Sequence, residues 1–230
     1  MKTRLHAAGF TLIELLTVIG IIALLAAIAF PILSKMQESG RSAQNMANLR
    51  QIHVALRAFA QDNDNCLPPV ASDANTVWDR DNLAPYLPKR SDGRQNAIFI
   101  GPNAKYKGFE TKDISRAYSA TECMLGIEPD TGAVSFNFRL LRNLNSIVDP
   151  VKSPLVFDGA QNGNLRYSAE EVKWVQLTGA GDLKPPAAAS FIDFRNQGDA
   201  HFLYVDGHVA GMNRTEAAAQ LTSKAWQGIQ

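Results

Sequence analysis

The sequence has few cysteines and no marked excess of charge of either sign. Its 230 residues include two cysteines, Cys66 and Cys123, and 23 basic residues against 22 acidic ones give a formal net charge of +1. Neither cysteine lies in a Cys-x-x-Cys pattern or at a Cys/His spacing typical of a metal site. Because no basic stripe is evident either, we expect no nucleic-acid partner.

Motifs of common catalytic sites are also missing. The chain contains no Gly-x-Ser-x-Gly, no glycine-rich phosphate loop before a lysine and no His-Glu-x-x-His. No positive argument for an enzyme remains, and we expect a non-enzymatic protein without a cofactor.

Charge is scarcest close to the N-terminus. Among the 21 residues from Phe10 to Phe30, the only charged one is Glu14. At about 1.5 Å per residue, a helix of this length spans about 31 Å and could cross the hydrocarbon core of a bilayer. A carboxylate there costs about 3 kcal/mol even on lenient insertion scales, so its presence needs a functional reason. A cationic amine within a few ångströms would hold it ionised.

The residues around this acid resemble a known signal. Gly9-Phe10-Thr11-Leu12-Ile13-Glu14, after a short basic leader, is similar to the prepilin signal of type IV pilins and type II secretion pseudopilins. The resemblance implies that a prepilin peptidase cleaves between Gly9 and Phe10, and that the new amino group of Phe10 is methylated. It also implies that Glu14 pairs with the Phe10 amine of a neighbouring subunit, and that Pro31 is the helix-loosening proline of this class.

The same resemblance implies a location and partners. It predicts a single-pass inner-membrane protein with a cytoplasmic N-terminus and a periplasmic C-terminal domain, which later enters a filament. Lys2 and Arg4 favour this orientation, although Lys35 and Arg41 beyond the apolar segment weaken the charge rule. The expected partners are the prepilin peptidase, the inner membrane and other pilin-like subunits, contacted through the N-terminal helix.

Two other functions stay open. Ala27-Ile28-Ala29 has the form of a signal-peptidase site, so the chain could be a secreted soluble protein cleaved after Ala29. It could also be a membrane-anchored periplasmic binding module, with the regions of Trp78 and Trp174 lining a sugar or peptide groove.

Helical periodicity continues beyond Pro31. Apolar residues recur at three- and four-residue steps until turn residues and Pro68-Pro69 interrupt them; they are Met46, Leu49, Ile52, Leu56 and Phe59. We therefore predict a cleaved leader over residues 1–9, one helix over 10–62 that is transmembrane over 10–30, and a globular domain over 63–230. The predicted fold class is α+β and pilin-like: the amphipathic half of the helix packs on a small antiparallel sheet with long loops.

Within that domain, short patterns predict individual elements. Leu83–Leu87 is expected to be a short helix, Ala97–Gly101 a strand, Pro154–Gly159 a strand that ends in a turn, and Thr215–Trp226 a helix capped by Thr215. His201–Val205 and His208–Met212 predict a hairpin joined by a two-residue type I′ turn at Asp206-Gly207. Its Phe202 and Tyr204 would face one way, and Leu203 and Val205 the other.

The C-terminal part also resembles a pilin-like family whose members carry a histidine, nine residues, and then Asp-Gly. Asp206-Gly207 matches that signature, but the position of the histidine is occupied by Asn196. An asparagine could keep a local hydrogen-bonding role, whereas a titrating or metal-binding role would be lost.

Three groups of residues invite a chemical interpretation. His201, Asp206 and His208 could suggest a metal or acid–base site, but a structural hairpin explains them better. Asp62 and Asp64 are weak calcium candidates, because the full calcium-loop pattern is absent. Cys66 and Cys123 could form a disulfide in an oxidising compartment or remain two free thiols.

Overall fold

The structure is a computed structural model that describes residues 12–69, 82–88, 97–99, 101–102, 118–124, 141–161, 176–177 and 190–221. It divides into two compact units, residues 1–40 and 41–230. The predictions for Gly9, Phe10, Trp78 and Trp174 lie outside the described residues.

The first element, α1 (Leu12–Asp62), confirms the long helix and its predicted end at Asp62. Pro31 lies inside it without ending it, although a proline removes one backbone donor. The Ser34 hydroxyl donates to the Phe30 carbonyl at 3.1 Å, and that of Thr17 donates to the Glu14 carbonyl at 2.9 Å, so these polar side chains are satisfied by the helix itself.

The part of α1 in residues 12–40 is apolar and exposed. Leu12 is 81 % exposed and Phe30 is 70 % exposed, and most of the other large apolar side chains of this stretch are more than half exposed. Among the described residues, one helix, α1, is long enough and apolar enough to cross a membrane. A signal sequence near the N-terminus would also meet these two criteria.

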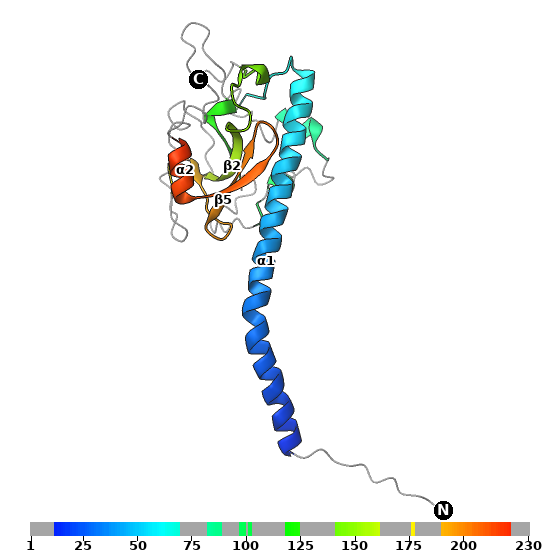
Figure 1. Cartoon of the computed structure of the whole chain (residues 1–230). Helices are drawn as coiled ribbons and strands as arrows, with labels where there is room; N and C mark the ends of the chain where they lie inside the picture. Colours follow the sequence, from blue (N-terminus) through cyan, green and yellow to red (C-terminus); the bar gives the residue numbers. More distant parts are fainter. Residues whose placement is uncertain are drawn as a thin grey trace, which may run out of the picture. The chain divides into compact units, whose positions relative to one another are not determined.

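Within the described part of residues 41–230, six strands form one sheet. Its strands are β1 (Tyr118–Ala120), β2 (Pro154–Gln161), β3 (Gln176–Leu177), β4 (Ser190–Ile192), β5 (Asp199–Tyr204) and β6 (Val209–Asn213). Figure 1 labels its strands β2 and β5. The order is β3-β4-β2-β5-β6, and β1 also pairs with β2. All pairs are antiparallel except β3–β4, which is parallel, so the predicted antiparallel sheet is confirmed apart from this short pair.

Short helices complete this unit. They are α2 (Arg214–Leu221) and the single-turn 3₁₀ helices η2 (Ala84–Tyr86), η3 (Ala97–Phe99), η4 (Glu122–Met124) and η5 (Leu144–Ser146). The strand predicted at Ala97–Gly101 is wrong, because Ala97–Phe99 forms η3; periodicity does not distinguish so short an apolar run from a buried turn.

The sheet has a core on each face. Leu203 and Val205 belong to the cluster that contains Leu49, Ile52 and Leu56 of α1. Phe202 and Tyr204 belong to a second cluster with Ala217 of α2, so α2 covers the other face (Figure 1). The predicted alternation of these four hairpin residues is confirmed.

The hairpin turn differs from the predicted one. Leu203 pairs with Val209, the Tyr204 amide donates to the His208 carbonyl at 3.0 Å, and the Gly207 amide donates to the Tyr204 carbonyl at 2.9 Å. Three residues therefore form the loop, and only Gly207 of the two predicted turn residues has a positive φ, of +95°. A type I turn followed by a left-handed glycine satisfies the strand twist as well as a type I′ turn does, and it shifts the register by one residue.

The cap of α2 is also different from the predicted Thr215. The Asn213 side-chain oxygen accepts from the Thr215 amide at 2.9 Å and the Glu216 amide at 3.1 Å. Glu216 returns the bond by accepting from the Asn213 amide at 2.9 Å, which makes a capping box that begins two residues earlier.

Candidate functional site

Glu14 lies in the first turn of α1, in the exposed apolar part of the helix. Acidic residues are favoured at helix N-termini, because the first amides carry partial positive charge. The structure describes the helix around Glu14, whereas the predicted cleavage site between Gly9 and Phe10 precedes the described residues.

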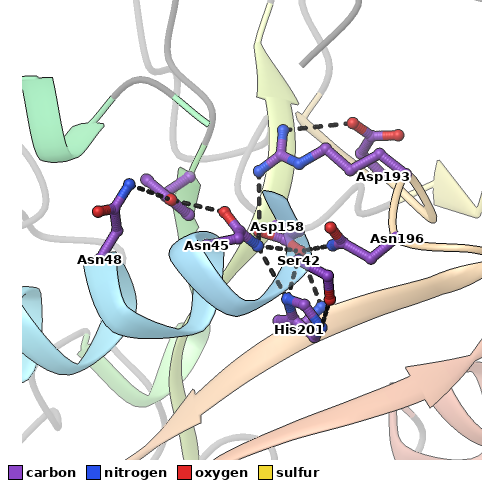
Figure 2. A network of polar contacts seen from close by, with 9 residues as sticks. Ser42, Asn45, Asn48, Asp158, Asp193, Asn196 and His201 are labelled. Atoms are coloured by element: carbon purple, nitrogen blue, oxygen red, sulfur yellow. Dashed lines mark hydrogen bonds and ion pairs between the residues drawn. The ribbon is translucent and has the colours of Figure 1, made fainter. Parts of the chain in front are cut away.

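A second candidate is a buried polar network in the unit of residues 41–230 (Figure 2). Its centre is Asp158 of β2, which is fully buried. The Asp158 carboxylate accepts hydrogen bonds from the Asn45 amide at 2.7 and 2.8 Å, the Arg195 guanidinium at 2.8 Å, the Asn196 amide at 2.6 Å and the backbone amide of His201 at 2.9 Å. A buried carboxylate is tolerated when several donors and a cation replace its water, and this site supplies both.

The network joins α1 to the sheet through Asn45. The Tyr118 hydroxyl of β1 donates to the Asn45 oxygen at 2.6 Å, which directs the Asn45 amide nitrogen towards Asp158. That nitrogen also lies 2.9 Å from Nδ1 of His201. Because an amide nitrogen only donates, Nδ1 accepts and the ring proton lies on Nε2, which is 3.3 Å from the Ser42 hydroxyl.

Ser42, His201 and Asp158 thus occur in the order of a catalytic triad, but their chemistry is different. A protonated Nε2 cannot take a proton from Ser42, and Nδ1, 3.5 Å from Asp158, faces the Asn45 donor instead of donating to the carboxylate. Ser42 also lies within α1, whose backbone amides are bound inside the helix and cannot form an oxyanion hole. The arrangement fixes side chains in place and does not activate a nucleophile.

Burial sets the protonation of the network. Desolvation lowers the pKa of His201, and the nearby Asp158 carboxylate only partly offsets this effect. Desolvation also raises the pKa of Tyr118 above its ordinary value, helped by Asp158. Both side chains are therefore neutral at pH 7. The Asp158 carboxylate pairs with the Arg195 guanidinium at 2.8 Å, and Arg195 also pairs with Asp193 at 3.3 Å.

The sequence pointed to only part of this network. The family signature points to Asn196 and predicts a local hydrogen-bonding role. Its buried side chain instead donates to Asp158, 38 positions earlier, and its local hydrogen bonds, to Asp199, are backbone ones. Asn45, Tyr118 and Arg195 were missed. A signal existed for Asn45, because it lies four residues before Leu49 on the buried face of the helix, where a polar side chain needs a partner.

The histidines of the hairpin do not share a site. His201 lies in the network, whereas His208 stacks on Tyr204 with ring centroids 4.2 Å apart and contacts the Asp206 carboxylate at 2.6 Å. No group of three or more metal-ligating side chains is present in the described part of the chain. In the structure, His201 therefore contributes to the polar network, and Asp206 and His208 contribute to the hairpin loop.

The weak calcium candidates have other contacts. The Asp62 carboxylate accepts from the Tyr86 hydroxyl at 3.0 Å. Asp64 has a φ of +52°, which ends the helix, and its carbonyl accepts from the Asn143 amide at 3.0 Å. No metal is predicted at these two residues, which stay weak calcium candidates.

The two cysteines are free thiols in the structure. Cys123 is fully buried, and desolvation raises the pKa of its thiol to about 12. Cys66 is half-buried and pairs with Asn143 through an isolated β-bridge. Of the two outcomes expected for the cysteines, the structure has the unpaired one.

Comparison with known proteins gives a family motif and a similar pilin. The prokaryotic N-terminal methylation motif matches residues 4–30. The chain is similar to the type IV major pilin protein PilA of Myxococcus xanthus (strain DK1622), with 41 % identity over 56 residues, which is 24 % of this chain and 26 % of that protein. No solved structure matches the chain significantly.

Proposed function

We propose that this type IV pilin-like chain is a filament subunit, either a pilin or a type II secretion pseudopilin. A prepilin peptidase would cleave it between Gly9 and Phe10 and the Phe10 amine would be methylated. Its helix would anchor it in the inner membrane with the globular domain in the periplasm. On assembly, the apolar half of α1 would leave the lipid and pack against the same segment of other copies.

The observation that carries this proposal is that Glu14 is the only charged residue in the apolar segment of residues 10–30. Glu14 lies inside the matched methylation motif, in a segment whose large side chains are exposed in the isolated chain. Exposed apolar side chains need lipid or other subunits to cover them, and an acid among them needs a cation. The amine of Phe10 on a neighbouring copy would supply that cation.

The Asp158 network supports a structural role for the globular domain. A filament subunit needs its domain fixed on the helix that carries it, and the network ties Asn45 of α1 to three strands of the sheet. The pilin-like N-terminus and the inert tautomer of His201 both favour a non-enzymatic subunit.

The mass of the mature N-terminal peptide tests the processing. A chain that begins with methylated Phe10 supports the proposal. A chain that begins at Phe30 would instead identify a secreted protein cleaved after Ala29. An intact Met1 would identify a plain membrane anchor.

The substitution Glu14→Gln tests the pairing. It keeps the shape of the side chain and removes its charge, so we expect membrane insertion and cleavage to persist while the yield of sheared filaments falls at least tenfold. Glu38→Gln, an acid of the same helix outside the apolar segment, is the matched control and should leave the yield unchanged. Normal filament yield from Glu14→Gln would contradict the pairing.

A further inference from the structure

A stripe of α1 faces solvent along the whole of its second half. It consists of Ala43, Ala47, Arg50, Val54, Arg57 and Gln61, which recur at three- and four-residue steps on the side of the helix opposite its buried residues. This set is called the outer stripe. Val54 at its centre is 67 % exposed, the largest exposure among the large apolar side chains in the described part of residues 41–230.

The charge of the outer stripe has one sign. From Arg41 to Gln61 the helix carries three arginines and no carboxylate. Arg50 and Arg57 lie one turn to either side of Val54, so they flank the exposed valine with positive charge. His53, at the edge of the stripe, has its pKa lowered chiefly by burial and adds no charge at pH 7. The outer stripe therefore fits a partner with an apolar projection and carboxylates beside it.

The same unit carries a projection of that kind in the loop of residues 148–152, here called the valine loop. Val148 is 54 % exposed and Val151 is 58 % exposed, with Pro150 exposed between them. Apart from Val54, these valines and Leu141 are the large hydrophobic side chains most exposed within the described part of residues 41–230.

The valine loop is held rigidly. The Lys152 amide donates to the Asp149 carbonyl at 3.1 Å and closes a turn with Pro150 inside it. The Val205 amide donates to the Ser153 carbonyl at 3.1 Å and the Asp206 amide to the Pro150 carbonyl at 3.4 Å, which tie the loop to the hairpin. A projection that is already ordered loses little entropy when it docks.

Carboxylates accompany the valine loop. Asp149 lies between the two valines along the chain, and a hydrogen bond from Lys152 keeps the pKa of its carboxyl below the usual range. Asp206 lies next to Pro150 and contacts His208. The Asp149–Lys152 ion pair, at 3.0 Å, involves a lysine that is 72 % exposed, so it contributes little to stability. The Asp149 carboxylate can therefore exchange Lys152 for another cation.

We propose that the outer stripe of one copy binds the valine loop of a second copy, with Val148 and Val151 packed around Val54 and with Asp149 between Arg50 and Arg57. This contact rests on the proposed function and names a surface that the globular domains use in the filament. The two surfaces consist of different residues, so one copy can offer its outer stripe to a second copy and its valine loop to a third. A head-to-tail contact of this kind can repeat along a filament without closing on itself.

Cysteine cross-linking in intact cells tests this contact. The full-length chain carries Val54→Cys and Val151→Cys in a Cys66→Ser background, and a short bifunctional thiol reagent is applied to the cells. We expect a ladder of dimers, trimers and higher oligomers on a denaturing gel, because each copy offers one cysteine to the copy before it and another to the copy after it.

Each single-cysteine variant is a matched control and should give less than a tenth of the cross-linked product. Dimers from a single variant without a ladder from the double variant would show a symmetric contact and overturn the proposal, and so would the absence of any ladder. Because the cross-linking is read in whole cells, it is independent of the N-terminal mass and filament yield that decide the proposed function.

A charge swap gives a second measurement. Asp149→Arg and Arg57→Asp should each lower the yield of sheared filaments several-fold, and the two together should restore it, because the opposite charges meet again. If the double variant is no better than the worse single one, the contact is refuted. The processed N-terminus of each variant is checked in parallel, so that a failure of cleavage is not mistaken for a failure of docking.

Discussion

Asp158 is the one residue on which the polar network depends. It is fully buried and accepts from four other residues, one of them the arginine of the buried ion pair. Removing one partner of a buried ion pair costs more than the pair contributes, because the other charge is left without its counter-ion.

Asp158→Asn should therefore destabilise the domain by about 3 kcal/mol, since it removes one of the two carboxylates that pair with Arg195, leaving Asp193, and places an amide donor against other donors. Thermal unfolding of the purified full-length chain, followed by near-ultraviolet circular dichroism, measures this effect. Asp149→Asn breaks an exposed, solvent-screened ion pair instead and should leave the unfolding transition nearly unchanged. Equal losses for the two variants would refute the importance of the buried carboxylate.

Gly207 is constrained in two ways. Its φ of +95° disfavours other residues, and a Cβ there would lie 2.7 Å from Cε1 of His53. Gly198 has almost the same φ, of +96°, but a Cβ there would meet nothing within 4 Å.

Gly207→Ala should accordingly cost more than Gly198→Ala. Backbone strain alone accounts for about 1–3 kcal/mol at either position, and the clash with His53 adds to it only at Gly207. Denaturant titration of both variants measures the difference. Adding His53→Ala should recover stability in Gly207→Ala and not in Gly198→Ala; a loss of the same size in the two glycine variants would show that the ring gives way freely.

At the scale of elements, the contact between α1 and β5 contains a titratable group. Desolvation lowers the pKa of His201, and Asp158, Arg195 and Asp199 are the charged groups that act on it. As the pH falls below about 6.5, the ordinary pKa of histidine, this residue therefore binds protons less readily in the folded state than in the unfolded state. Stability from this group is complete above that pH and decreases as the pH falls below it.

Unfolding free energy of the full-length chain should thus decrease between pH 7 and pH 5, and His201→Gln should make this dependence shallower. His53 acts in the same direction, because burial lowers its pKa as well. His53→Gln should remove a separate part of the slope, and the double variant should show the weakest dependence. An unchanged slope in His201→Gln would mean that the ring is readily hydrated in the folded state.

Elements with a strong local pattern could be predicted from the sequence. The long helix ends at Asp62 as expected, since turn residues and two prolines follow, and the alternation along β5 places Leu203 and Phe202 on opposite faces. The register of the β5–β6 hairpin and the capping residue of α2 were harder to predict from the sequence. A three-residue loop and a two-residue turn can both use Gly207, and only the pairing of Leu203 with Val209 distinguishes them.

The candidate site could be predicted only in fragments, because its members are far apart along the chain. Asn45 and Asp158 are separated by 113 positions and meet only when α1 packs on the sheet. No local pattern encodes such a contact. In the sequence, Asp158 before Gly159 suggests the end of a strand, whereas β2 continues to Gln161 and buries the acid.

At the scale of the whole molecule, the chain consists of two units with different solvation. Residues 12–40 expose their apolar side chains, whereas residues 41–230 contain both hydrophobic clusters and the polar network. The second unit therefore has the buried surface that independent folding requires, and the first has the surface that requires lipid, detergent or other subunits.

A fragment of residues 41–230 should then be soluble without detergent and should unfold cooperatively, whereas the full-length chain should sediment with membranes. The network offers a sensitive readout, because Asn45 lies only a few residues from the new N-terminus and helix ends fray. If the fragment keeps the network, Asp158→Asn should lower its melting temperature by several degrees, as we also expect for the full-length chain. A fragment that is soluble but insensitive to Asp158→Asn would show that residues 12–40 are needed to hold the start of this helical half in place.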